Sequence, residues 1–149
     1  MKIAIVGAKD RNTGEDKALV EELIDLAAKT YPNCVFVTML THEGVGLFVK
    51  QKCLEKGTND NFRFQMIEVN LRLYAKQLSK SEVSQIYLAR NATMFELADM
   101  LIYLANNDRR GMTEDLVLNR IVPSGRPYII LLPNEKAKLP DFSGGGADA

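Results

Sequence analysis

The chain has 149 residues, of which 46% are hydrophobic and 26% are charged, and its 19 basic residues balance its 19 acidic residues. This composition predicts one soluble globular domain that buries about two thirds of its unfolded surface. The zero net charge argues against a broad basic surface for duplex DNA or an anionic membrane, although it leaves room for local basic clusters. The apolar runs are shorter than the roughly 20 residues of a membrane span, and the chain starts with a strand-like segment rather than a signal peptide. We therefore expect a cytoplasmic protein without membrane contacts.

Residues 2–7 form a short apolar run that ends in glycine, as in a buried strand of a parallel sheet. A helix is predicted over 15–30, where Leu19, Leu23 and Leu26 recur at helical spacing and acidic residues occupy the first turn. A second strand follows over 34–40, and a short second helix is expected to end near residue 55.

Residues 62–74 alternate apolar and polar side chains and are expected to contain the third strand, with a bulge or an early end near Ile67. Ser79 or Ser81 can cap the next helix, which runs to about residue 98. A fourth strand is expected over 99–104, a last helix from residue 113 to about residue 122, and a fifth strand over 126–132.

Strands that alternate with helices across short loops predict βαβ units. The expected fold is therefore α/β, a Rossmann-like three-layer sandwich with a mostly parallel sheet of about five strands. We place this single domain at residues 1–133 and expect residues 134–149 to form a polar, flexible tail.

The cysteines and the histidine point to structural roles. Cys34 and Cys53 lie in apolar patterns without the spacing of a metal site, so we expect reduced thiols in the core. His42 has no second histidine or cysteine near it in the sequence and is expected to be a loop or capping residue. The sequence therefore predicts no metal site and no cofactor.

A ligand site is expected at the carboxyl edge of the sheet, where strand ends feed loops and helix N-termini. Gly7 allows a ligand to approach the backbone closely, and the polar residues after it, Lys9, Asp10 and Arg11, include two cations for a phosphate or carboxylate. This segment matches neither the GxGxxG fingerprint nor a P-loop. A solvated turn is the alternative reading.

Gly44 and Gly46 open the second predicted helix. Backbone N–H groups at such a position can cradle an anion. A pair of glycines is a weak signal, and ordinary turn chemistry is the alternative.

Arg90 falls inside the apolar stripe of its predicted helix, four residues before Met94, and Asn91 lies beside that stripe. A guanidinium on an apolar face needs a partner or a ligand, because an unpaired buried charge is very costly. We expect Arg90 to contact a ligand, to form an internal ion pair with Asp99 or Glu114, or to do both.

The segment 109–115, RRGMTED, is the last candidate. Gly111 permits a left-handed or closely approached backbone, Thr113 is a plausible N-cap, and Glu114 and Asp115 suit the positive end of a helix dipole. The helix dipole alone can therefore account for the two acidic residues, and no binding or catalytic role is needed to explain them.

Two carboxylates at a helix start also repel a phosphate bound at the same spot. If a nucleotide binds there, we expect a carboxylate to meet a sugar hydroxyl or to act as acid, base or nucleophile. Arg90, Arg109 or Arg110 would then bind the phosphate.

Taken in order, these segments resemble the SLOG superfamily of Rossmann-like nucleotide-binding proteins, which includes the Lonely Guy phosphoribohydrolases and the DprA-type DNA-processing proteins. The resemblance covers about residues 1–133. It rests on IAIVGAKDR, the Gly-Val-Gly loop, an RN-x-x-M helix, the Ala-Asp before the fourth strand, and Gly-Met-Thr-Glu before the last helix. A bacterial and phage branch of the superfamily has the closest pattern. The implied pocket comprises Gly7, Lys9, Asp10, Arg11, Gly44, Gly46, Arg90, Asn91, Arg110, Gly111, Met112 and Thr113.

Lonely Guy enzymes carry a PGGxGTxxE loop where this chain has NDRRGMTED, so their final acid corresponds to Asp115 or, in a shifted register, to Glu114. The nucleoside 2-deoxyribosyltransferases, which share a similar sheet, would place Glu114 as the nucleophile.

Three functions therefore follow from the sequence. The first is binding of a nucleotide or nucleotide-derived small molecule. The second is hydrolysis or transfer at an N-glycosidic bond by Glu114 or Asp115, and the third is a non-catalytic structural subunit. Relatives of this fold often pair, so we also expect a homodimer or higher homo-oligomer. The ligand's base and the role of residues 62–80 stay open.

Overall fold

The computed structural model describes residues 1–39, 43–55, 63–67 and 79–141. The side chains of residues 63–67, Tyr87 and Met112 are not described. In the first half of the chain, the elements in order are β1 (Lys2–Gly7), α1 (Gly14–Thr30), β2 (Val35–Met39), α2 (Val45–Glu55) and β3 (Arg63–Ile67). The second half comprises α3 (Lys80–Leu97), β4 (Met100–Leu104), α4 (Met112–Leu116), the π-helical turn η2 (Val117–Ile121), α5 (Val122–Ser124) and β5 (Tyr128–Leu131).

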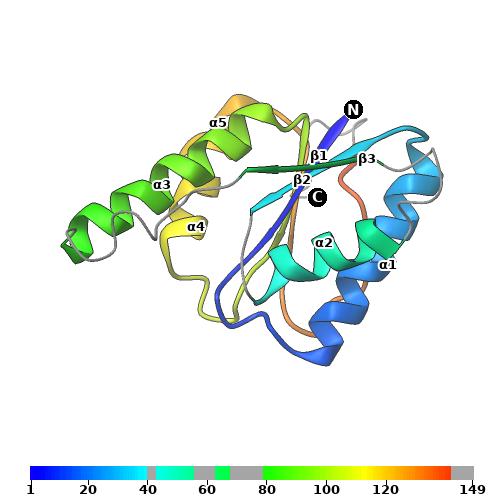
Figure 1. The fold of residues 1–149 in the computed structure, drawn as a ribbon, viewed down its shortest axis with the longest axis horizontal. Helices are drawn as coiled ribbons and strands as arrows, with labels where there is room; N and C mark the ends of the chain where they lie inside the picture. Colours follow the sequence, from blue (N-terminus) through cyan, green and yellow to red (C-terminus); the bar gives the residue numbers. More distant parts are fainter. Residues whose placement is uncertain (40–42, 56–62, 68–78, 142–149) are drawn as a thin grey trace.

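The strands form one five-stranded sheet in the order β3-β2-β1-β4-β5. Each neighbouring pair is parallel. Helices α1 and α2 lie on one face of the sheet, and α3, α4 and α5 lie on the other (Figure 1). The prediction of a Rossmann-like three-layer α/β fold is therefore confirmed.

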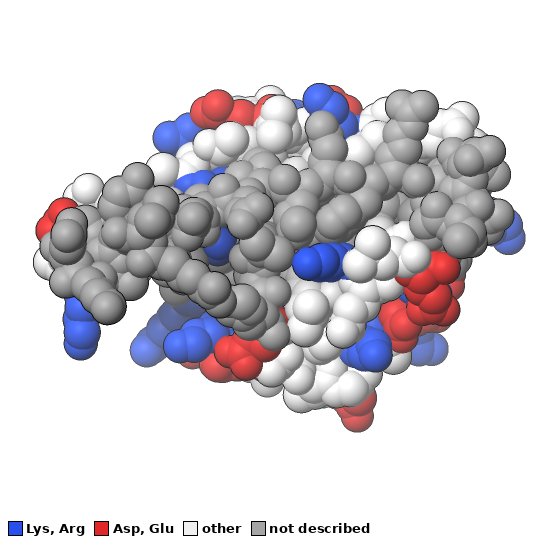
Figure 2. All heavy atoms as spheres, in the orientation of Figure 1, with Lys and Arg blue, Asp and Glu red and all other residues white. Residues whose placement is uncertain are grey.

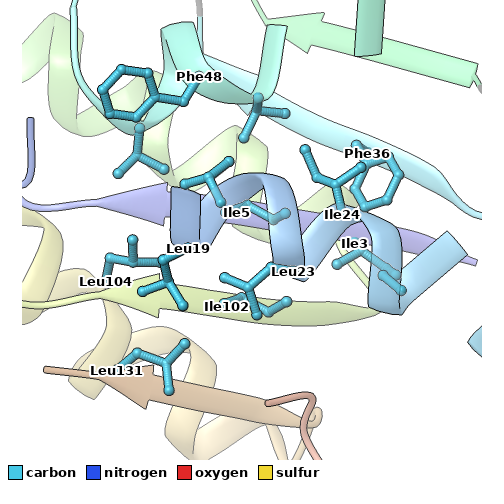
Figure 3. Close-up of a cluster of buried hydrophobic side chains, with 14 of the residues drawn as sticks. Ile3, Ile5, Leu19, Leu23, Ile24, Phe36, Phe48, Ile102, Leu104 and Leu131 are labelled. Atoms are coloured by element: carbon cyan, nitrogen blue, oxygen red, sulfur yellow. The ribbon is translucent and has the colours of Figure 1, made fainter. Parts of the chain in front are cut away.

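The face under α1 and α2 holds one of two apolar clusters (Figure 3). Alternate residues of β1, Ile3 and Ile5, point into it and meet Leu19 and Leu23 of α1. Both cysteines are buried in this cluster as free thiols, as expected. Removing this apolar surface from water is the main favourable contribution to folding.

The opposite face is buried by α3 and by the helical segment after β4. The intervening residues of β1, Ala4 and Val6, pack there with Met94 and Phe95 of α3 and with Tyr103 of β4. The alternation along β1 is the period of two that places successive side chains on opposite faces of a strand.

The chain stays in contact with the core after β5. Ala137 and Leu139 pack against the first cluster, and Pro140 is buried. Three apolar residues of the expected tail therefore contact the body of the protein or are buried, while most of their neighbours between residues 134 and 141 are exposed. Residues 142–149 lie outside the described residues.

Two long helices begin with the capping chemistry that the sequence offers. The Ser79 hydroxyl accepts a hydrogen bond from the Glu82 N–H, and the Glu82 carboxylate accepts one from the Ser79 N–H. The expected serine cap is therefore confirmed. Thr13 and Asp16 form the same arrangement at α1. Each such cap satisfies backbone donors that a helix start leaves free.

The last helical segment corrects the sequence prediction. The N-cap of α4 is Gly111, at φ 120°, with no side-chain hydrogen bond, so Thr113 lies inside the first turn and is not the cap. The segment then widens into η2 and continues through α5 to Ser124, beyond the predicted end.

Basic and acidic side chains are interspersed on the described part of the face in Figure 2. Within the described residues, no helix combines the length and the apolar character needed to cross a membrane.

Candidate functional site

A cavity of about 660 Å³ lies at the carboxyl edge of the sheet. Its walls come from the ends of β1, β2 and β4, the start of α2, two residues of α3, and the connection between β4 and α4. Parallel strands place their carboxyl ends at one edge, where loops and helix starts form a crevice. The cavity volume falls in the usual range for small-molecule sites.

The cavity brings together ten of the predicted ligand-binding residues, which come from four separate segments of the chain. They are Gly7, Lys9, Asp10, Gly44, Gly46, Arg90, Asn91, Arg110, Gly111 and Thr113. Met112 lies between two of them, but its side chain is not described.

The lining carries charges of both signs. The cations are Lys9, Arg90 and Arg110, and the acids are Asp10, Glu43 and Asp108. Lys9 and Arg110 are exposed, so their ammonium and guanidinium groups can move to meet an anion. The acids can accept hydrogen bonds from hydroxyl or amino groups.

Arg90 and Asn91 lie on α3 where the helix meets the body of the protein. Only 8% of Arg90 and 5% of Asn91 is exposed, although both are polar. Glu114, one of the acids expected to pair with Arg90, is paired with Arg109. Asp99, the other, accepts a hydrogen bond from the Lys2 backbone N–H.

Two residues that line the cavity each carry a buried polar atom with unused hydrogen-bonding capacity. Thr38 Oγ1 and Asn91 Oδ1 are buried, and neither has a hydrogen-bond partner among the described residues. An unsatisfied buried polar group costs about 1–3 kcal/mol. Such a cost is usually tolerated at a functional site, where a ligand or water can remove it.

Arg11 does not line the cavity, and its guanidinium is committed to the protein itself. It is 3% exposed, and its Nε donates to Asp16 Oδ1 at 2.7 Å. Its Nη1 donates to the carbonyls of Ala105 at 2.7 Å and Leu131 at 2.9 Å. Arg11 therefore joins the ends of β4 and β5 to the start of α1.

The two predicted catalytic acids also lie outside the cavity lining. Glu114 is 3% exposed, and its Oε1 accepts hydrogen bonds from Arg109, whose Nη2 lies 2.7 Å away. Asp115 is exposed. A nucleophile must approach the reacting carbon to about 3–3.5 Å, and neither acid is among the residues that line the cavity.

Tyr103 connects the buried acid to the cavity. Tyr103 lines the cavity from β4. Its burial, and to a smaller extent the nearby Glu114 carboxylate, raise the pKa of its phenol well above the ordinary value of 10.0. The phenol is therefore neutral at physiological pH and can serve there as a hydrogen-bonding group.

Glycine is required at position 7 by the packing of α2 as well as by the cavity. A Cβ at this position would lie 2.2 Å from Val45 Cγ2. The end of β1 can approach the first residue of α2 only because Gly7 has no side chain. The Gly44 N–H, which we expected to be available to an anion, donates to Asn12 Oδ1 at 2.8 Å.

The sequence prediction missed several lining residues, among them Thr38, Met39 and Tyr103. They belong to strands whose apolar runs indicate burial and carry no separate signal for a site. Asn106 and Asp108 lie in the connection after β4, so their position shortly after a strand end was the signal that could have identified them.

His42 lies outside the described residues. Among the described residues, no group of three or more His, Cys, Asp or Glu side chains is arranged to hold a metal ion.

The sheet order and the edge cavity define a Rossmann-like α/β protein with a cavity at the carboxyl edge of its sheet. No protein-family model matches the chain, and no curated protein matches it. The solved structures that it resembles include a molybdenum cofactor binding protein from the phototrophic bacterium Rippkaea orientalis. That likeness has a TM-score of 0.60 and 18% identity, over 89% of this chain and 77% of the other.

A second similar structure is DNA processing protein A from Helicobacter pylori, for which a single-stranded DNA binding mode is described. Its TM-score is 0.55 at 17% identity, over 100% of this chain and 76% of the other. At these identities the likeness shows a shared fold. That shared fold agrees with the Rossmann-like fold that the sequence resemblance implied.

Proposed function

We propose that the edge cavity binds a nucleotide or a nucleotide-derived ligand. The observation that carries this proposal is the combination of cations with buried, unsatisfied polar atoms in one cavity of about 660 Å³. A nucleotide supplies the complementary groups, because its phosphate matches the cations and its sugar and base carry hydrogen-bond donors.

The division of charges within the lining supports the same ligand class. Lys9 and Arg110 can bind a phosphate, while Asp10 and Asp108 can accept hydrogen bonds from sugar hydroxyls. A polyanion would meet these carboxylates as well as the cations, so a ligand with few negative charges fits better.

The fold neighbours add support of a general kind. By their names, one binds a molybdenum cofactor and the other binds single-stranded DNA. Function is set by the site rather than the fold, so the cavity lining carries the proposal. We propose binding rather than N-glycosidic chemistry, because Glu114 and Asp115 lie outside that lining.

The experiment is a thermal-shift and calorimetric screen against nucleosides, mono- and dinucleotides, cyclic nucleotides, short single-stranded DNA and ribose 5-phosphate. A ligand at about 100 times its Kd should contribute roughly 2.7 kcal/mol and raise the midpoint by several degrees. A flat response to the whole panel would contradict the proposal and favour a structural subunit.

Charge-removing variants then locate the phosphate. Lys9→Ala and Arg110→Ala should each weaken a nucleotide about tenfold and leave the matching nucleoside unchanged, because each removes one charge-assisted hydrogen bond. Lys17→Ala and Arg120→Ala are matched controls, since both residues are exposed outside the lining. If all four variants lost the same nucleotide affinity, the phosphate would not be bound by the cations of the cavity.

A further inference from the structure

We infer that Thr38 and Asn91 are specificity-determining residues that hydrogen-bond to the two ends of a nucleoside lying across the carboxyl edge of the sheet. This inference rests on the proposed function and deepens it, because it specifies how the ligand lies and which groups it must carry.

The two residues reach the cavity from opposite faces of the sheet. In β2, Phe36 belongs to the cluster under α1 and α2, and Val37 belongs to the cluster under α3. Strand alternation then places Thr38 on the face of Phe36. Asn91 is on α3, which covers the other face.

Both residues nevertheless line the same cavity, so the cavity continues around the edge of the sheet. Gly7, at the end of the central strand β1, lies in that lining as well. A single ligand that contacts Thr38 and Asn91 must therefore cross the end of the sheet.

The chemistry of the two groups determines what the ligand must present. A carboxamide oxygen can only accept, so Asn91 Oδ1 requires an N–H or O–H donor. The Thr38 hydroxyl can accept or donate. Thr38 is 1% exposed, so bulk water does not satisfy this hydroxyl.

A nucleoside carries hydrogen-bonding groups at both ends, with N–H groups on the base and hydroxyls on the ribose. Ribose 5-phosphate supplies only one of these ends. We therefore expect nucleosides and their monophosphates to engage both residues, and ribose 5-phosphate to engage one.

The test measures the affinities of the four ribonucleoside 5′-monophosphates and of ribose 5-phosphate by calorimetry. Thr38→Val removes the hydroxyl and Asn91→Leu removes the whole carboxamide, and both substitutions keep the side-chain size. Each should weaken the tightest-binding monophosphate about threefold to tenfold, which is the usual effect of losing one hydrogen bond. The double variant should lose the product of the two factors, because distant contacts act independently.

Controls separate recognition from folding. Thr38→Ser keeps the hydroxyl and should retain affinity. Without ligand, Thr38→Val and Asn91→Leu should melt at the wild-type temperature or a few degrees above it, since each removes an unsatisfied buried polar atom. A structural role would instead lower the melting temperature.

The inference is overturned if the monophosphate binds the wild type and either single variant leaves its affinity within twofold. It is also overturned if both substitutions weaken ribose 5-phosphate, because the two residues would then contact the same end of the ligand. If another ligand of the screening panel binds the wild type but no monophosphate does, the inference is overturned and the proposed function stands. If nothing in the panel binds, the proposed function itself fails.

Discussion

Gly7 shows how a single missing side chain determines the packing beside the cavity. The Cβ of any other residue would lie 2.2 Å from Val45 Cγ2 and 2.9 Å from Val45 Cβ. Close packing leaves no room to absorb such a contact without moving the backbone. The glycine is therefore required by the start of α2, whatever the cavity binds.

Gly7→Ala should lower the free energy of unfolding by about 1–3 kcal/mol, because an overpacked core distorts its surroundings. Urea unfolding measures this change. Gly14→Ala is the matched control, since nothing lies within 4 Å of its added Cβ, and it should change stability by less than about 0.5 kcal/mol.

Adding Val45→Ala to the Gly7→Ala variant should recover part of the loss, because it removes the nearest methyl group. Equal stabilities of Gly7→Ala and Gly14→Ala would show that the end of β1 yields more easily than this packing implies.

Individual residues also show where sequence reasoning succeeds and where it stops. Arg90 and Asn91 could be identified from the sequence because polar side chains interrupt an apolar stripe. Arg11 was expected at the ligand, yet its guanidinium binds Asp16 and two carbonyls. Its role depends on backbone atoms near residues 105 and 131, and no local pattern reveals atoms so distant in sequence.

At the scale of elements, the loop after β1 holds the edge of the sheet together. Arg11 bonds to the ends of β4 and β5, and Asn12 accepts the N–H of Gly44 before α2. These contacts fix the relative positions of the cavity walls. The loop therefore determines the shape of the site without Arg11 entering it.

Arg11→Met should destabilise the protein by about 3–5 kcal/mol, because it leaves the Asp16 carboxylate buried without its ionic partner. Chemical unfolding followed by circular dichroism checks this value. Arg120→Met breaks an exposed ion pair with Glu96 and should cost less than about 1 kcal/mol. Similar costs for the two variants would mean that Arg11 is not a structural tie.

Element boundaries were predictable wherever local chemistry sets them. The serine cap of α3 and the apolar run of β1 needed no tertiary information. The cap of α4 was mispredicted because Gly111 occupies that position through its backbone conformation, at φ 120°, without a side-chain hydrogen bond. The widening into η2 was not predicted, because no residue pattern in the sequence indicated it.

At the scale of the whole molecule, two buried thiols and a buried phenol make the free energy of unfolding depend on pH. Burial, together with the nearby Cys34, raises the pKa of the Cys53 thiol from 9.0 to about 12. Burial also raises the pKa of Cys34, and that of Tyr103 is raised by burial and by Glu114. The folded protein thus retains protons that the unfolded chain releases above about pH 9.

The free energy of unfolding should therefore be insensitive to these groups below about pH 9 and should fall between pH 9 and 12, where the folded state binds more protons. Urea titrations at pH 8 and pH 10.5 measure the loss. Cys53→Val removes one of these protons and should reduce the loss. Stability that rose across this interval would contradict the assigned environments.

The position of β1 in the centre of the sheet has a consequence for how the chain folds during synthesis. Its neighbour β4 is distant in sequence, and the hydrogen bond between Lys2 and Asp99 beside it spans 97 residues. At about 5–20 residues per second, a ribosome needs roughly 5–20 seconds to make that intervening chain. For that time the backbone N–H and C=O groups on one edge of β1 lack their partner strand, so this edge of the nascent chain stays open to pairing with other chains.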